Sequence, residues 1–156
     1  MSEVIVTSQA NLRNEVRYGV GHSLTTDEPI EAGGEDAGPD PYTLLLAALG
    51  SCISMTVTLY ARRKQWPLEK VTVRLRQNRV HVKDCEECAL LQEGYVHRIE
   101  RAVIVDGPLT EAQRARLQEI AHKCPVHKTL SSPIVIAELK DDELKDSEAG
   151  DFFDNK

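Results

Sequence analysis

Residues 38–71 read GPDPYTLLLAALGSCISMTVTLYARRKQWPLEKV, and this stretch decides the fold. Asp40 is a preferred N-cap residue, and Pro41 suits the first position of a helix because its φ is fixed and it lacks an N–H. Apolar or small residues follow at spacings of three and four, which place them on one helix face: Leu45, Leu49, Cys52, Thr56 and Leu59. The pattern predicts a long helix from about Pro41 to Lys64, ended by the Trp66-Pro67 pair.

The predicted helix also meets the simplest description of a membrane span. No charged residue lies between Pro41 and Ala61, and the basic run Arg62 to Lys64 follows. Serine and threonine residues dilute the stretch, however, and a helix that is apolar on most sides is also found at the centre of a protein core. We favour the core interpretation and expect no membrane association.

The segments on either side of this helix alternate in the manner of β-strands. The chain through Thr26 is β-like, and NEVRYGV and HSLTT are expected to form a hairpin around Gly19 to Gly21. Two more strands are predicted, from Val71 to about Val82 and from His97 to Val105, because apolar and polar residues alternate in both.

A second helix is predicted to open at the capping-box pair Thr110 and Gln113. It should end or kink at Cys124, because Pro125 disfavours helical geometry at the residue before it. A short turn through Leu130 and a final strand, IVIAEL at 134–139, follow. Together the elements predict an α+β fold, with antiparallel strands wrapped around a long central helix and a second helix.

Length and charge narrow the class of protein. The chain has 156 residues and a net charge of −6. We predict a single domain over 1–139 and an acidic, disordered tail over 140–156.

The negative charge gives no electrostatic support to nucleic-acid binding. The N-terminal residues lack the basic and apolar regions of a secretory leader, so we expect a cytoplasmic protein with reduced thiols.

Two of the four cysteines, Cys52 and Cys124, fall on the predicted helices. Cys52 lies on the apolar face, where a free cysteine is often a small buried hydrophobe. Cys124 has histidine and lysine residues on both sides, and nearby cations lower a thiol pKa and raise the fraction of reactive thiolate. From the residues alone, a structural role for Cys52 and a chance cluster at Cys124 stay open beside redox roles.

Two segments resemble the signatures of the OsmC-like protein family. Residues 38–71 are similar to its central-helix signature, with a Pro-led start, small residues and a mid-helix cysteine. HKCPVHKTL at 122–130 is similar to its second signature, and the order and separation of the two also match. The resemblance extends from about Val16 to Leu139 and is closer to a less-studied branch of the family.

The resemblance implies an intertwined, swapped homodimer with active sites at the subunit interface. It also implies that Cys52 is the peroxidatic cysteine and Cys124 the resolving cysteine of a thiol-dependent organic hydroperoxide reductase. In that chemistry Cys52 becomes a sulfenic acid, condenses with Cys124 to a disulfide, and is restored by an external dithiol. No cofactor is expected.

The sequence departs from the family's peroxidases near the start of the long helix. Those proteins have a glutamate just after the helix-starting proline, where this chain has Tyr42 followed by Thr43. They also use an N-terminal arginine, for which Arg17 is the candidate here. The departure leaves an alternative function: a non-catalytic dimer that binds a small apolar ligand at the subunit interface.

The other two cysteines, Cys85 and Cys88, form a CxxC in the predicted connection between strands. Such a pair holds zinc or cycles as a redox couple. Zinc would need two further ligands, and His81 and His97 are the near candidates. We expect no metal site, with zinc binding and a redox role as the alternatives.

Overall fold

The computed structural model describes residues 3–84 and 94–139 and shows two compact units. The first unit contains the chain up to Leu44 together with the described residues from Ile134, and the second contains Leu45–Pro133. Antiparallel sheets and separate helices confirm the predicted α+β fold. The acidic tail predicted over 140–156 and the Cys85–Cys88 pair lie outside the described residues, and a single domain over 1–139 stays a prediction.

The first unit is built on a three-stranded antiparallel sheet. Its strands are β1 (Val4–Ser8), β2 (Asn14–Tyr18) and β3 (His22–Thr26), in the order β1-β2-β3. The hairpin predicted around Gly19 to Gly21 is confirmed. Both of these glycines have positive φ, 54° and 70°, a conformation that glycine adopts without the steric cost of a Cβ.

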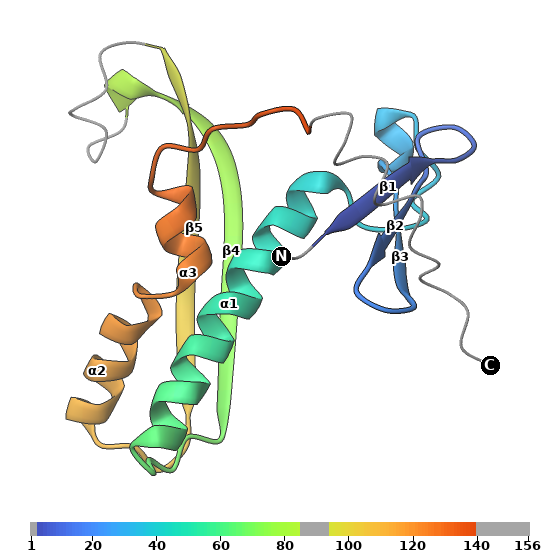
Figure 1. Cartoon of the computed structure of the whole chain (residues 1–156). Helices are drawn as coiled ribbons and strands as arrows, with labels where there is room; N and C mark the ends of the chain where they lie inside the picture. Colours follow the sequence, from blue (N-terminus) through green and yellow to red (C-terminus); the bar gives the residue numbers. More distant parts are fainter. Residues whose placement is uncertain (1–2, 85–93, 140–156) are drawn as a thin grey trace. The chain divides into compact units, whose positions relative to one another are not determined.

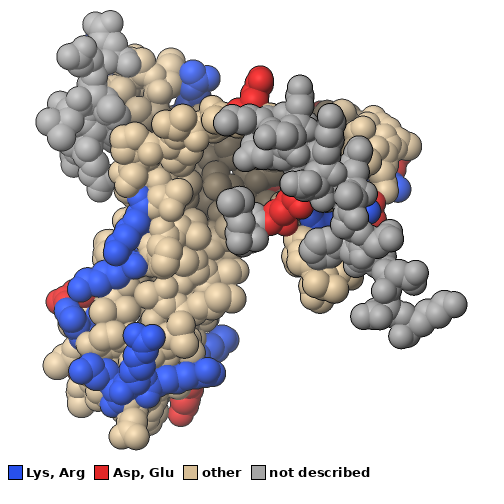
Figure 2. All heavy atoms as spheres, in the orientation of Figure 1, with Lys and Arg blue, Asp and Glu red and all other residues tan. Residues whose placement is uncertain are grey.

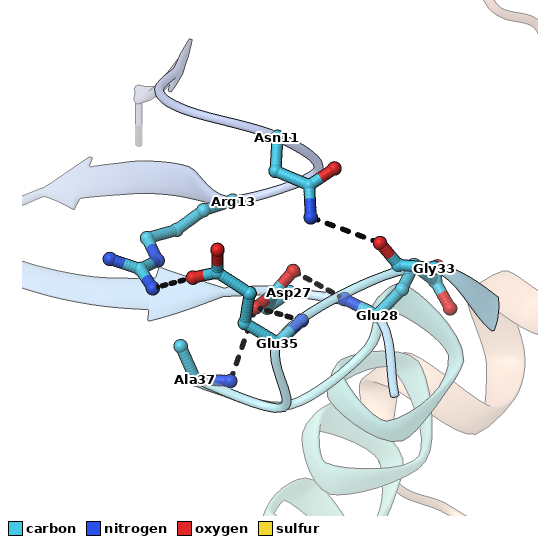
Figure 3. Close-up of polar contacts among 7 residues, drawn as sticks. All are labelled: Asn11, Arg13, Asp27, Glu28, Gly33, Glu35 and Ala37. Atoms are coloured by element: carbon cyan, nitrogen blue, oxygen red, sulfur yellow. Dashed lines mark hydrogen bonds and ion pairs between the residues drawn. The ribbon is translucent and has the colours of Figure 1, made fainter. Parts of the chain in front are cut away.

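The buried carboxylate of Asp27 organises the loop between β3 and the long helix (Figure 3). Its oxygens accept hydrogen bonds from the backbone N–H groups of Glu28, Glu35 and Ala37 at 2.9, 3.0 and 3.2 Å. Burial alone would raise the pKa of Asp27, but these three bonds and the charge of Arg13 outweigh it and lower the pKa. Arg13 also forms an ion pair with Glu35. This pair ties the residue before β2 to the loop that binds the Asp27 carboxylate.

We expect Asp27→Ala to loosen this loop, because three N–H groups lose their acceptor. A depressed carboxyl pKa gives stability that is present above the unfolded pKa of about 3.9 and is lost as the pH falls through the folded value. The variant should therefore unfold at lower urea concentration at pH 7, and the difference from wild type should shrink in acid. Glu31→Ala, which removes an exposed carboxylate from the same loop, is the control.

The long helix is α1 (Pro41–Arg63), and its predicted start is confirmed. The Asp40 carboxylate accepts hydrogen bonds from the N–H groups of Tyr42 and Thr43 at 2.9 and 3.1 Å, as an N-cap does. The predicted buried face is wrong in part. Leu59 was assigned to the buried face from the sequence, but it is 51% exposed. The residues of α1 that are buried repeat every four positions and form a row: Leu49, Ile53, Val57 and Ala61.

In the second unit α1 lies along a long antiparallel hairpin (Figure 1). The hairpin strands are β4 (Lys70–His81) and β5 (Tyr95–Asp106), with the 3-10 turn η2 (Val82–Asp84) after β4. Val71 pairs with Val105 and Val73 with Val103, and these four side chains belong to the core beside α1. The helix α2 (Glu111–Ala121) begins at the predicted capping box of Thr110 and Gln113 and completes this core with Leu117 and Ala121.

Two predictions near the C-terminus are wrong. The segment after Cys124 is a short helix, α3 (Pro125–Leu130), and not a turn, because Pro125 occupies the first helical position, where a missing N–H costs nothing. The segment 134–139 is not a strand, and Val135 and Ile136 are 89% and 95% exposed. A strand needs a neighbouring edge for its hydrogen bonds, and none of the described strands pairs with this segment.

By length and composition α1 would be able to cross a membrane, a property that core helices of soluble proteins share. Its buried row packs into the core of the second unit, as the preferred interpretation of the sequence requires. Figure 2 shows Lys and Arg side chains gathered at the end of the second unit where α1 ends, and Arg62 and Arg63 lie in its last turn. Cations at this position complement the negative end of the helix dipole.

Candidate functional site

Cys52 lies in the middle of α1 and is partly buried. It is next to Ile53 of the buried row, so its side chain lies at the border between the core and the exposed side of the helix. Its sulfur accepts a hydrogen bond from the backbone N–H of Val126 at 3.5 Å. A residue of α1 thus reaches the first turn of α3, 74 positions further along the chain.

Cys124 lies between α2 and α3, and its side chain is fully buried. Its backbone is extended, with φ −63° and ψ 137°, as expected for a residue before proline. The Cys124 sulfur accepts the N–H of His127 at 3.2 Å and so acts as the N-cap of α3. Helix geometry explains this contact, because the first N–H groups of a helix have no partner within the helix.

The two sulfurs predicted to work together are neighbours in the structure. They accept hydrogen bonds from consecutive backbone N–H groups, those of Val126 and His127, and the Cys124 thiol hydrogen-bonds to Cys52. Both cysteines are free thiols. Because N–H groups of the same helix turn bind both sulfurs, the two thiols are placed to exchange a proton with each other and to form a disulfide after oxidation.

The pKa of the Cys124 thiol is raised, which is opposite to the effect expected from the cations beside it in the sequence. Burial is the main cause, and the hydrogen bond that its S–H makes to Cys52 also favours the protonated form, whereas the His127 N–H opposes the shift. Lys123 and Lys128 are exposed to solvent, so their charges are screened from the buried sulfur. The raised pKa means that the Cys124 thiol keeps its proton at neutral pH.

The histidines beside Cys124 form a small cluster at the junction of α2 and α3. The His122 and His127 rings meet edge to face at 5.9 Å between their centroids. Burial, followed by the charges of Arg101 and His127, lowers the pKa of His122, so this ring is neutral at neutral pH. Arg101 of β5 donates a hydrogen bond to the carbonyl of Ala121 at 3.1 Å and closes the C-terminal end of α2.

The third site residue proposed from the sequence, Arg17, lies in the first unit, as do Tyr42 and Thr43, which stand where the family's peroxidases have a glutamate. Arg17 is on β2, opposite Ile5 and Ser23, and its Nε is buried without a hydrogen bond among the described residues. Its role beside Cys52 therefore stays a prediction. Thr43 donates its hydroxyl to the Asp40 carboxylate and is used in capping α1. Tyr42 is half exposed in the first turn of α1.

The two backbone N–H groups of α3 are the site components that sequence reasoning missed. They belong to Val126 and His127, within a segment already singled out for its cysteine. The signal that would have found them is Pro125, which starts a helix and leaves the next two N–H groups without helical partners. Within residues 3–84 and 94–139, no group of three His, Cys, Asp or Glu side chains gathers as metal ligands.

Known proteins agree with this arrangement of elements. Residues 33–138 match the family of OsmC-like proteins. A putative osmotic stress induced and detoxification response protein from Psychrobacter arcticus has a similar solved structure, with 20% identity, a TM-score of 0.65, and coverage of 83% of this chain and 88% of that chain. An OsmC-like protein from Mycoplasma pneumoniae gives 18% identity, a TM-score of 0.66, and coverage of 85% and 88%.

An organic hydroperoxide resistance protein from Legionella pneumophila is also similar in structure. It has 20% identity and a TM-score of 0.60, and 83% of this chain and 88% of that chain are covered. No curated protein matches the sequence significantly. At these identities the likeness to solved structures establishes the fold. Because the family match spans more than half of its residues, the chain belongs to the OsmC-like protein family.

Proposed function

We propose that the protein is a thiol-dependent peroxidase that reduces organic hydroperoxides with Cys52 and Cys124. The observation that carries the proposal is the meeting of the two sulfurs at the first turn of α3, one partly exposed and one buried. The hydroperoxide resistance of the Legionella protein named above supports it as well. The two environments differ, and this difference supports the choice of roles for the two cysteines.

Cys52 is the attacking cysteine in this proposal. Its sulfur is the more accessible of the two, and the N–H of Val126 is in place to donate to a negatively charged sulfur. The thiolate attacks one oxygen of the hydroperoxide, so that an S–O bond forms while the O–O bond breaks. The alkoxide that leaves takes up a proton to become the alcohol, and Cys52 is oxidised to the sulfenic acid.

Cys124 is the resolving cysteine. It keeps its proton because it is buried and hydrogen-bonded to Cys52, so it does not compete for the peroxide. After oxidation its sulfur attacks the Cys52 sulfur, the S–O bond breaks, and the proton of Cys124 leaves with the hydroxyl as water. An external dithiol then reduces the disulfide by exchange in a reducing compartment such as the cytoplasm.

The alternative function is a passive dimer that binds a small apolar ligand. Exposed apolar side chains on α1 favour it, since Met55 and Leu59 are 63% and 51% exposed. Under the peroxidase proposal the same apolar side chains border an active site at the subunit interface and favour an organic hydroperoxide over hydrogen peroxide. The two functions make opposite predictions about the thiols.

Thiol titration distinguishes the two functions. The chain has four cysteines. We expect one equivalent of cumene hydroperoxide per subunit to remove two thiols rapidly, and peptide mass spectrometry to show a Cys52–Cys124 link. A passive binder would keep all its thiols. The double variant Cys85→Ser, Cys88→Ser is the matched control: it should lose the same two thiols, with turnover changed by less than about threefold.

The proposal includes a homodimer, and we expect the exposed side of α1 to form part of the interface between the two subunits. On the side away from the buried row, Ala48, Ser51, Met55 and Leu59 are all exposed at spacings of three and four. Obligate interfaces bury on the order of 2,000 Å² or more and resemble a divided core. We therefore expect Met55→Asp to shift the protein from dimer to monomer in sedimentation at micromolar concentration.

The control for this variant is Ile104→Asp. Ile104 is 44% exposed on β5, and it points away from the core because its neighbours Val103 and Val105 pack into it. The aspartate at 104 should leave the dimer intact. A wild-type protein that sediments as a monomer would rule out the dimer.

A further inference from the structure

The short helix α3 depends on one of the two reactive cysteines for its first turn. It has six residues, Pro125–Leu130, and none of them is fully buried. Its N-cap is Cys124, whose sulfur accepts the His127 N–H, while the Cys124 carbonyl accepts the Lys128 N–H at 3.2 Å. Val126 and Leu130 pack against the core only in part.

A helix of this length has little stability of its own. Isolated helices shorter than roughly 12 residues are marginal in water, because nucleation is costly and each turn adds few hydrogen bonds. The cap and the partial packing of Val126 and Leu130 therefore decide whether α3 stays closed. One of these two supports is a sulfur that changes its chemistry during the proposed reaction.

Disulfide formation removes this support. The S–S bond length is about 2.0 Å, so both sulfurs must move toward each other from positions set by the Val126 and His127 N–H groups. The disulfide carries no charge, and Cys124 no longer has a proton to donate to Cys52. Both sulfurs then leave the positions from which they accept the two N–H groups, which weakens both hydrogen bonds at the start of α3.

We propose that α3 is a redox-gated cover over the sulfur pair, closed by Cys124 as its N-cap in the dithiol state and opened when the Cys52–Cys124 disulfide forms. The inference rests on the proposed function, which supplies the disulfide. In this inference Cys124 has a second role besides resolving the sulfenic acid, because it also holds α3 in position. The opening admits the dithiol that completes the cycle.

Access is the chemical reason for such an opening. An external thiolate must attack one sulfur of the disulfide; a new S–S bond forms to the reductant while the Cys52–Cys124 bond breaks and the other cysteine leaves as a thiolate. The Cys124 sulfur is fully buried beneath the first turn of α3 in the dithiol state. While that turn stays closed, it shields this sulfur from attack and keeps water from a thiolate that departs from Cys124.

Hydrogen exchange followed by mass spectrometry tests the opening. The disulfide is formed with diamide, a thiol oxidant, so that the experiment does not depend on peroxidase activity. We expect the peptide containing Val126 and His127 to exchange about tenfold faster in the oxidised protein, which corresponds to the loss of a typical N-cap. Peptides of β4 and β5 in the same digest serve as the internal reference.

Two substitutions of Cys124 test the cap without any oxidation. Serine is a strong N-cap and alanine a poor one, although neither forms the disulfide. In reducing buffer, Cys124→Ser should protect the α3 amides as the wild type does, whereas Cys124→Ala should exchange them about tenfold faster. The pair has matched size, so a general effect of losing the buried sulfur would appear in both variants.

The outcomes separate this inference from the proposed function. Equal exchange in reduced and oxidised protein, equal exchange in the serine and alanine variants, or failure of diamide to link Cys52 and Cys124 would each overturn the role of α3. Consumption of cumene hydroperoxide is measured separately. A protein that opens α3 on oxidation but consumes no peroxide would refute the peroxidase and leave the redox-gated cover standing.

Discussion

Replacing Cys52 with serine is expected to reduce peroxide consumption to the uncatalysed background. The thiolate is the form of cysteine that attacks peroxide, and a serine hydroxyl has no comparable nucleophile at neutral pH. Cys52 is only partly buried and its sulfur accepts the Val126 N–H, so we expect this sulfur to be the atom that a peroxide meets first. The measurement is the loss of cumene hydroperoxide with excess dithiol present.

Replacing Cys124 with serine is expected to leave a single turnover per subunit. The first oxidation needs only Cys52, but no thiol then condenses with the sulfenic acid. Cys52 should accumulate sulfenic and then sulfinic acid, which intact-protein mass spectrometry detects as one and two added oxygen atoms. Serine at position 124 also retains an N-cap for α3, so a folding defect is not expected.

The two serine variants together test the assignment of roles. If Cys124→Ser lost the first oxidation and Cys52→Ser kept it, the roles would have to be exchanged. The different burial of the two sulfurs argues against that result, since Cys124 has no exposed surface and a raised pKa. A retained melting temperature in both variants shows that the loss of activity is chemical.

The start of α1 and the strands were predictable because their signals are local. Asp40 followed by Pro41 gave the cap and the first turn, and alternation in 71–82 and 97–105 gave β4 and β5. The buried face of α1 was less predictable. A helix with apolar residues on most sides has several candidate faces, and only the partner that it packs against selects the row containing Ile53 and Val57.

The failure at 134–139 has a different cause. IVIAEL has the composition of a strand, yet strand formation depends on a neighbouring edge that a sequence pattern does not specify. The electrostatic error at Cys124 is similar, because sequence neighbours such as Lys123 and Lys128 point to solvent while the sulfur is buried. The cations next to Cys124 in the sequence therefore gave the wrong direction for its pKa.

Substituting Gly107 with alanine is expected to destabilise the second unit by about 3 kcal/mol or more, the sum of backbone strain and steric overlap. Gly107 has φ +132°, where a side chain is strained. A Cβ at this position would lie 2.3 Å from the carbonyl oxygen of Pro67 and 3.0 Å from the nitrogen of Glu69. Both are backbone atoms, so no side-chain rotation relieves the overlap.

The surrounding hydrogen bonds increase the cost of any backbone movement. Arg114 donates to the carbonyls of Val105 and Gly107 at 2.5 and 2.8 Å, and the Glu69 N–H donates to Asp106 at 2.9 Å. Moving residue 107 away from Pro67 would strain these bonds, which hold the end of β5 to α2 and to the start of β4. Urea unfolding of Gly107→Ala should therefore show a lower midpoint at an unchanged slope.

Gly94→Ala is the matched control for this prediction. Gly94 has a similar φ of +103°, but a Cβ there would meet no atom of residues 3–84 and 94–139 within 4 Å. It should therefore show only the strain of a positive φ, about 1 kcal/mol. Equal destabilisation by the two alanines would mean that the overlap with Pro67 adds nothing to the loss of stability. The backbone where β5 meets the start of β4 would then move more easily than its hydrogen bonds suggest.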